Sequence, residues 1–410
     1  MKIYFNDPEY DGQFLRTLDH APLGAQIGEA WTIAAQIRVG DAASWYNAWS
    51  SYADRLYDLA VKSRAAGHRV SACNAFLRAS NYYRTAYIFM FALPIDPRVI
   101  EAYEKQTDSF QKAAALFEQP IEVLKIPYEN TTLPGYFIKP DASNTARRSL
   151  LCTGGYDGTC EELFFSVAGG ALKRGYNVLI FDGPGQGGAL VMQKLPMRAD
   201  WENVVTPVVD YLLTRPDVDS TRIALYGGSF GGYLAPRAAA FEHRVAACIA
   251  DAALFDPAAL SNKMFPPEIG SALAKNDVAV LEPFFNKLQE DTTQRFILGR
   301  GMWVHGATTP WEYFKMFQAY SLADVAKNIQ CPTFVAEAEN DRRRGGGKDL
   351  YNALRCPKEY VLFAASEGAC CFSCAVCSSS QFAASAGHRF ADVLAAVSEA
   401  LMSAAAQGRS

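Results

Sequence analysis

The spacing of apolar residues changes character near residue 120. From about residue 24 to 118, apolar and aromatic residues recur every three or four positions, which is a helical period, with almost no strand pattern. The clearest example of one apolar face is the set Trp45, Trp49, Tyr52 and Leu56. We expect a bundle of helices with an aromatic core, although some of these rings could instead line a pocket shared with the rest of the chain.

After residue 120, short strands alternate with helical segments. The stretches IEVLKIPYE and LPGYFIKP predict an antiparallel pair. Further along come the apolar runs RSLLCTGG, YNVLIFDGPG, RIALYGGS, VAACIADA, PTFVAEAEND and EYVLFAAS. Apolar strands joined by helical crossovers predict an α/β fold, with a mostly parallel sheet and helices on both faces.

Between residues 255 and 322 the strand pattern disappears, and a helical insertion rich in Phe and Trp is expected. We therefore divide the chain into an N-terminal helical lid domain, residues 1–120, and an α/β domain, residues 121–410, which carries the insertion as a cap. In such sheets, ligands bind beyond the carboxyl ends of the strands. The loops that carry motifs in this chain all follow strand ends, so we expect the functional site there.

The sequence GGSFG at residues 227–231 stands between a strand pattern and a helix pattern. It matches G-x-S-x-G in the context of a nucleophile elbow, a turn so sharp that only glycines fit at its flanks. Ser229 would project above the sheet, and the N–H of Phe230 at the start of the helix could bind an oxyanion. The alternative is a glycine-rich turn with an idle serine.

A second oxyanion donor is expected in the loop CTGGYDGT, where paired glycines let the N–H of Tyr156 face the pocket. Asp157 in this loop is interpreted as a turn former, with contact to the substrate as the alternative. The loop FDGPGQGG after the next strand lacks G-K-[ST] and does not fit G-x-G-x-x-G. A phosphate-binding loop is therefore not predicted.

The segments GGYDGT, FDGPGQG and SFGGYLAPRAAAFEHR resemble the α/β-hydrolases that carry an N-terminal helical domain. This group includes fungal polyketide-shortening hydrolases of pigment synthesis and the bacterial 2,6-dihydroxypseudooxynicotine hydrolase. The resemblance implies the α/β-hydrolase fold and a serine hydrolase that forms an acyl-enzyme at Ser229. It also implies an acyl, ester or 1,3-diketone-like substrate, aromatic or polyketide-like and often cleaved at a C–C bond. Such a substrate would be enclosed between the helical domain and the sheet.

The resemblance places the triad acid at Asp341, at the end of the strand PTFVAEAEND. Chain order in this fold is serine, then acid, then histidine, and the acid fixes the tautomer of the histidine. Glu337 and Glu339 are alternatives in the same strand end, and Asp341 could also simply start a turn.

The triad histidine is missing from the place where the resemblance predicts it. Relatives have a histidine a few residues beyond an EG that follows the last strand, whereas this chain has CCF at residues 370–372. His388 is the histidine that follows Asp341, and we assign it as the base. His305, in the insertion, is the alternative, and a site without a triad histidine is the third interpretation.

A cysteine cluster occupies the same stretch and consists of Cys370, Cys371, Cys374 and Cys377. Zinc or an iron–sulfur cluster is a candidate ligand. However, adjacent cysteines do not easily ligate one tetrahedral ion, and no second pair or histidine stands at zinc-ribbon spacing. We expect free, oxidation-sensitive thiols, with no metal and no cofactor.

Composition narrows the function classes. The net charge is -4 and no basic cluster is present, which argues against a nucleic-acid partner. No apolar run reaches the roughly 18 residues of a membrane span, and the N-terminus lacks an apolar leader. We expect a cytoplasmic enzyme with a small-molecule substrate and leave a homodimer open. The alternatives are a non-catalytic ligand- or partner-binding descendant without the triad histidine, and an acyltransferase or cyclase that uses Ser229.

Overall fold

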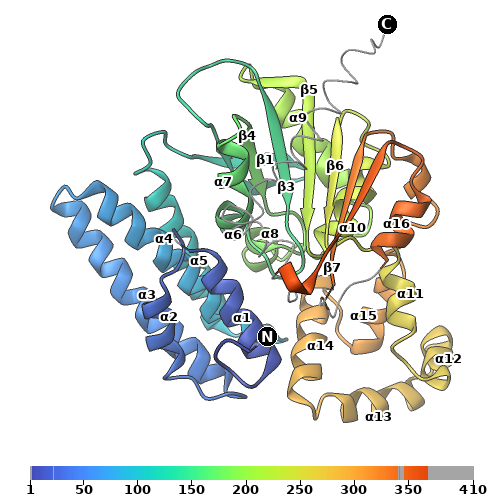
Figure 1. The fold of residues 1–410 in the computed structure, drawn as a ribbon. Coiled ribbons are helices and arrows are strands. Elements are labelled where there is room, and N and C mark those ends of the chain that lie inside the picture. Colours follow the sequence, from blue (N-terminus) through green and yellow to red (C-terminus); the bar gives the residue numbers. More distant parts are fainter. Residues whose placement is uncertain (1, 22, 340, 342–345, 368–410) are drawn as a thin grey trace, which may run out of the picture.

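The computed structural model describes residues 2–21, 23–339, 341 and 346–367, and these contain an eight-stranded sheet (Figure 1). The strand order is β1-β2-β4-β3-β5-β6-β7-β8. β2 runs antiparallel to both of its neighbours, and the other neighbouring pairs are parallel. The strands are β1 (Glu122–Tyr128), β2 (Thr131–Ile138), β3 (Arg147–Thr153), β4 (Asn177–Phe181), β5 (Val218–Gly228), β6 (Ala247–Asp251), β7 (Thr333–Ala338) and β8 (Lys358–Phe363).

The apolar runs of the sequence correspond to these strands, so the predicted mostly parallel sheet is confirmed. β4 and β6 are buried along their whole length, because helices cover both faces of the sheet. β5 begins at Val218, before its apolar run, and its polar first half is largely exposed. The helices between the strands are α6 (Cys160–Leu163), α7 (Gly169–Leu172), α8 (Gly187–Val191), α9 (Glu202–Leu213), α10 (Gly231–Ala239) and α16 (Gly347–Ala353).

Helices precede the first strand, as the helical period predicts (blue to cyan in Figure 1). They are α1 (Pro8–Asp19), α2 (Ile27–Ala34), α3 (Ala42–Ala65), α4 (Arg69–Ala86) and α5 (Pro97–Ala114). Trp45 and Trp49 are fully buried within one apolar cluster that continues into β3 and β4, which confirms the aromatic stripe as core. Phe110 of α5 packs on Tyr136 of β2 with ring centroids 4.7 Å apart, and thereby joins the helices to the sheet.

One of these helices, α1, lies ahead of the region where we expected helical structure. Its start signal is present in the sequence, because Asp7 caps the helix by accepting from two backbone N–H groups and Pro8 follows at the first helical position. Phe14 on this helix is fully buried. The helix matters for the site because it carries Arg16.

The segment between β6 and β7 is helical, as predicted for the insertion. It contains α11 (Pro257–Asn262), α12 (Pro267–Lys275), α13 (Val278–Leu288), α14 (Thr292–His305) and α15 (Pro310–Phe317). The insertion has a small apolar core of its own, in which Phe285 and Phe314 stack with centroids 5.6 Å apart. Short helical turns complete the fold at Ile88–Met90, Phe164–Ala168, Ala326–Asn328 and Ala365–Glu367.

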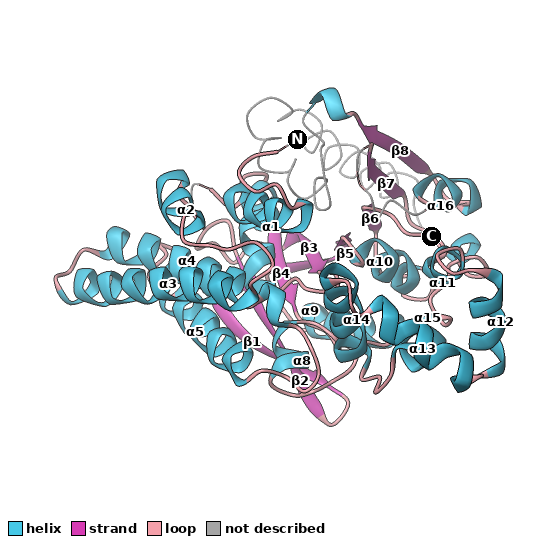
Figure 2. Ribbon diagram, turned by 90° about the horizontal axis from the view of Figure 1, so that it is seen from below, coloured by secondary structure: helices cyan, strands magenta, loops and turns pink. Residues whose placement is uncertain are grey.

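Seen from below, α1 and α14 both lie near the end of β5 (Figure 2). Two ion pairs explain this arrangement, since Arg16 of α1 and Arg300 of α14 both contact Asp157 in the loop after β3. Among the described residues, no helix combines the length and apolar character that crossing a bilayer requires.

Candidate active site

Ser229 occupies a strained turn between β5 and α10. Its φ is 57°, in the left-handed region that non-glycine residues rarely adopt. The turn is tight enough that a Cβ on Gly227 would lie 2.0 Å from the carbonyl oxygen of Gly231. Ser229 itself stays partly exposed while its neighbours are buried. The glycines and the strand-to-helix context therefore form the elbow that the sequence predicts.

The loop after β3 lies directly against this serine. A Cβ on Gly155 would come within 2.8 Å of the Phe230 nitrogen and 2.9 Å of Ser229 Oγ. Gln186, in the loop after β4, holds this approach in place, because its Nε2 donates to the carbonyls of Gly154 and Gly155 at 2.7 and 3.2 Å. The sequence analysis did not identify Gln186, because the contact depends on two loops far apart in sequence.

A small cavity of about 40 Å³ opens beside Ser229. Its other walls are Arg16, Gly154, Gly155, Asp157, Gly158, Glu162, Leu163, Ser166 and Gly228. Arg16 reaches it from α1, and Glu162 from α6. The sequence analysis missed both residues as site candidates, because neither belongs to a motif.

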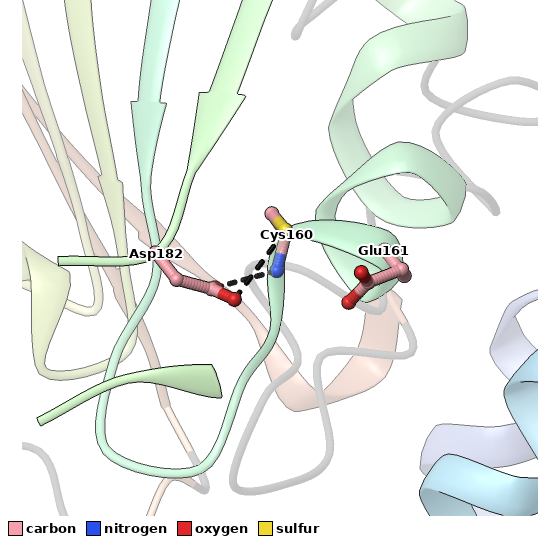
Figure 3. Close-up of side chains that lie close together, drawn as sticks. All are labelled: Cys160, Glu161 and Asp182. Atoms are coloured by element: carbon pink, nitrogen blue, oxygen red, sulfur yellow. Dashed lines mark hydrogen bonds between the residues drawn. The ribbon is translucent and has the colours of Figure 1, made fainter. Parts of the chain in front are cut away.

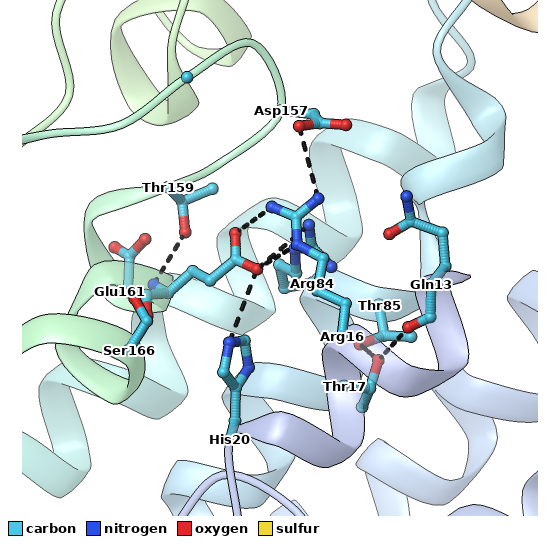
Figure 4. A network of polar contacts seen from close by, with 12 residues as sticks. Gln13, Arg16, Thr17, His20, Arg84, Thr85, Asp157, Thr159, Glu161 and Ser166 are labelled. Carbon is cyan, nitrogen blue, oxygen red and sulfur yellow. Dashed lines mark hydrogen bonds and ion pairs between the residues drawn. The ribbon is translucent and has the colours of Figure 1, made fainter. Parts of the chain in front are cut away.

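Arg16 is held in the cavity wall by two carboxylates (Figure 4). Its Nε and Nη2 donate to the two oxygens of Glu162, each at 2.6 Å, and its Nη1 lies 3.4 Å from Asp157. Burial alone would raise the pKa of Glu162, but Arg16 and Arg84 outweigh that effect and lower it. Glu162 is therefore ionised at neutral pH. Asp157 forms ion pairs, so the interpretation of this residue as a turn former alone is incomplete.

Asp341 lies just beyond β7, where its N–H donates to the carbonyl of Ala338 at 3.2 Å. The register pairs Gly228 at the end of β5 with Asp251 of β6, and Asp251 with Ala336 of β7. Ser229 and Asp341 thus follow the same edge of the sheet, separated by one strand.

The two glutamates considered as alternative acids have other partners. Glu337 accepts from the Gly347 N–H at 3.1 Å and from the Tyr360 hydroxyl at 2.8 Å. Glu339 accepts from the backbone N–H of Ala365 at 2.8 Å. These bonds connect β7 to the segments that follow it, and they favour structural roles for both glutamates.

His388 and the cysteines at positions 370, 371, 374 and 377 lie outside the described residues. His305, the alternative base, ends α14 and is buried. Its Nε2 bonds the hydroxyl of Tyr156, and its Nδ1 lies 3.4 Å from the hydroxyl of Tyr320. Burial lowers the pKa of His305 to about 3, so the ring is neutral at physiological pH.

Tyr156 connects this histidine to the elbow. Its ring packs edge-on against Phe230 with centroids 4.8 Å apart, while its hydroxyl bonds His305. Phe317 and Tyr320 add rings within 6 Å of Phe230. The insertion thus contacts the loop after β3 through aromatic side chains next to the serine.

A second buried cluster holds Cys160, Glu161 and Asp182, whose ligand-type atoms all lie within 4.8 Å of one another (Figure 3). Asp182 accepts from the Cys160 and Gly188 N–H groups at 2.7 and 2.9 Å. Glu161 accepts from the Tyr136 hydroxyl at 2.9 Å. Burial first, and then the charge of Glu161, raise the pKa of Asp182 to about 7. Protein donors thus already occupy the oxygens of both carboxyl groups.

Comparison with known proteins agrees with this geometry. Residues 150–396 match the family described as the alpha/beta hydrolase family. The chain is 35% identical over 352 residues to the 20-hydroxy-prefusarin hydrolase FUS2 of Gibberella moniliformis, covering 82% of this chain and 83% of that protein. It is 36% identical over 350 residues to the hydrolase acrC of Aspergillus aculeatus, covering 80% and 81%. The crystal structure of 2,6-dihydroxy-pseudo-oxynicotine hydrolase superposes with a TM-score of 0.68 at 22% identity, covering 88% of this chain and 90% of that one.

Proposed function

Because this chain belongs to the alpha/beta hydrolase family, we propose that it is a serine hydrolase that works through an acyl-enzyme at Ser229. The observation that carries the proposal is the position of Ser229. Its backbone is strained at φ 57°, its side chain lines a cavity, and the loop after β3 crowds against its Oγ. Strain of this kind persists where the surrounding structure enforces it, and it is concentrated at functional sites.

In the proposed mechanism, Ser229 Oγ attacks a substrate carbonyl and the N–H groups of Phe230 and Tyr156 bind the oxyanion that forms. His388 takes the serine proton and later delivers it to the leaving group, with Asp341 orienting its ring. Water then hydrolyses the acyl-enzyme. If His388 does not reach the serine, His305 is the alternative base, since it already contacts the loop after β3 through Tyr156.

We further propose that the substrate is an acyl compound, an ester or a 1,3-diketone-like compound, with aromatic or polyketide-like character. A 1,3-diketone-like substrate would be cleaved at a C–C bond. FUS2 is named for the hydrolysis of 20-hydroxy-prefusarin, which supports a related substrate class. The rings of Tyr156, Phe230 and Phe317 near the serine are suited to packing against an apolar ligand. The N-terminal helices up to residue 120 and the insertion at 255–322 would enclose that ligand.

A fluorophosphonate probe tests the proposal, because it reacts with activated serines. We expect the wild type to be labelled at Ser229 and Ser229→Ala to remain unlabelled. Ser166→Ala is a matched control, since Ser166 lines the same cavity. It should be labelled like the wild type. Thermal unfolding verifies that each variant is folded. Absence of labelling in folded wild-type protein would refute the hydrolase and favour the non-catalytic, ligand-binding alternative.

A further inference from the structure

The loop after β3 places two adjacent glycines, Gly154 and Gly155, beside the serine. Gly155 approaches Ser229 so closely that a Cβ at this position would lie 2.9 Å from Ser229 Oγ, so the site requires glycine there. Glycine also has the widest conformational freedom of any residue. The peptide groups between residues 154 and 156 are therefore not fixed by their own side chains, and an oxyanion donor in this loop needs support from elsewhere in the protein.

Gln186, in the loop after β4, contacts both of these peptide groups. Its Nε2 donates to the carbonyl oxygens of Gly154 and Gly155 at 2.7 and 3.2 Å. Its Oε1 accepts from the N–H of Gly183 at 3.0 Å. These partners assign the orientation of the amide, because the reverse orientation would place Oε1 against two carbonyl oxygens. The side chain is only 1% exposed, so its hydrogen bonds are made within the protein.

The backbone of Gln186 is itself held in place. Its N–H donates to the carbonyl of Gly183, and its carbonyl accepts from the N–H of Leu190, each at 3.0 Å. The preceding residue is closely packed, since a Cβ on Gly185 would lie 2.3 Å from Met197 Cβ. The side chain therefore reaches the loop after β3 from a backbone that has little room to move.

The two hydrogen bonds from Gln186 also set the direction of two N–H groups. In a trans peptide, the C=O and N–H bonds point in opposite directions, and both of these peptides are trans. The carbonyls of Gly154 and Gly155 point toward Gln186. The N–H groups of the same two peptides, on Gly155 and Tyr156, therefore point away from it. Gln186 follows β4 and Ser229 follows β5, and these strands flank β3, so both N–H groups are directed toward the side of the serine.

We propose that Gln186 is a positioning residue of the oxyanion hole, which turns the N–H of Tyr156 toward the oxyanion that forms when Ser229 attacks. The inference rests on the proposed function for the roles of Tyr156 and Ser229. It adds the N–H of Gly155 as a further donor, because successive N–H groups on one side of a chain form an anion-binding concavity. Gln186 holds these donors before a substrate binds, so they need no reorganisation during the reaction.

Gln186→Met tests the proposal, because methionine has nearly the shape of glutamine and cannot donate a hydrogen bond. We expect the fluorophosphonate to label Ser229 about 10²-fold more slowly than in the wild type, as for the loss of one oxyanion donor. Gln106→Met is the matched control. Gln106 is also buried, and its Nε2 donates to Thr159 Oγ1 at 2.8 Å and to Glu161 Oε2 at 3.0 Å. This control should be labelled at the wild-type rate, and urea unfolding measures the stability of both variants.

Gln186→Glu gives a readout that a purely structural role would not change. A neutral carboxyl group can donate its O–H to one of the two carbonyls, whereas a carboxylate cannot donate. Burial raises the pKa of a carboxyl group, so the new group becomes neutral as the pH falls from about 8 to about 5. Over this range, the labelling rate of Gln186→Glu divided by that of Gln186→Met should rise about tenfold, a part of what one donor contributes. The ratio removes the titration of Asp182 and Glu161 nearby, because both variants retain these groups.

Each outcome decides between the inference and its alternatives. If Gln186→Met is labelled at the wild-type rate, or if the ratio does not change with pH, the inference is wrong and the labelled serine keeps the proposed function. Equal slowing in Gln186→Met and Gln106→Met would show that damage to the fold controls the rate, and would also overturn the inference. If the folded wild type is not labelled, the proposed function fails, and the role of Gln186 fails with it.

Discussion

Replacing Gly155 with alanine is the sharpest test of the close approach between the loop after β3 and the serine. The added Cβ would lie 2.8 Å from the Phe230 nitrogen, about 0.6 Å inside the 3.4 Å at which ordinary contacts begin. It would also lie 2.9 Å from both Cβ and Oγ of Ser229. The backbone nitrogen of Phe230 cannot swing away as a side chain can, so the loop must retreat from the serine.

That retreat should separate the two proposed oxyanion donors. Loss of one oxyanion donor typically slows an acyl-transfer enzyme by about 10²–10³-fold. We expect Gly155→Ala to slow fluorophosphonate labelling of Ser229 by a similar factor. Strain from overpacking should lower the free energy of unfolding by about 1–3 kcal/mol. Labelling time courses and urea unfolding measure the two effects.

The adjacent glycine provides a matched control. A Cβ on Gly154 would meet only Leu163 Cδ1, at 3.8 Å, which is an ordinary contact. Gly154→Ala should therefore keep the wild-type labelling rate and stability. If Gly155→Ala labels as fast as Gly154→Ala, the loop does not constrain the serine, and the oxyanion argument fails.

Three further substitutions test stability. Gly227→Ala would place a Cβ 2.0 Å from the backbone oxygen of Gly231, and should cost about 3 kcal/mol or more of unfolding free energy. Gly270 lies in α12, and a Cβ added there would have no atom within 4 Å, so Gly270→Ala should raise the unfolding free energy by about 0.5–1 kcal/mol. If urea unfolding showed Gly227→Ala to be more stable than Gly270→Ala, the packing argument would be refuted. Because burial lowers the pKa of His305 to about 3, its stabilising contribution is complete above pH 6.5 and is lost as the pH falls toward 3. Between pH 6.5 and 3, the unfolding free energy of His305→Gln should therefore fall less steeply with decreasing pH than that of the wild type, by up to about 1.4 kcal/mol per pH unit. Parallel profiles of unfolding free energy against pH for the two proteins would show that the imidazole is not buried in its neutral form.

The local sequence was sufficient to predict those parts of the site whose structure depends on residues adjacent in the chain. The elbow at Ser229 could be predicted because its glycines, strand and helix are adjacent in the chain. The alternation of apolar runs likewise predicted the sheet, since buried parallel strands must be apolar on both faces. The position of Asp341 beyond β7 follows from the same logic, because strands in one parallel sheet end at one edge.

The charged wall of the cavity could not be predicted in this way. Arg16 and Glu162 are 146 residues apart, and neither has a neighbour that marks it as functional. Arg300 of the insertion donates to Asp157, which lines the cavity. Gln186 belongs to the loop after β4, whose sequence argued against a phosphate site. Nothing in that sequence indicated that Gln186 bonds the loop after β3 beside the serine.

The amino-acid sequence by itself determined which segments along the chain form strands and helices, the helical insertion and the strained serine turn. Each of these depends on periodicity or sterics within a few residues. Only the tertiary structure decided which side chains surround that serine. Packing brings α1, α6 and α14 against the loop after β3. The ion pairs formed there join residues that are far apart in the sequence. Electrostatic surroundings are set by distance in space, and distance along the chain does not specify them.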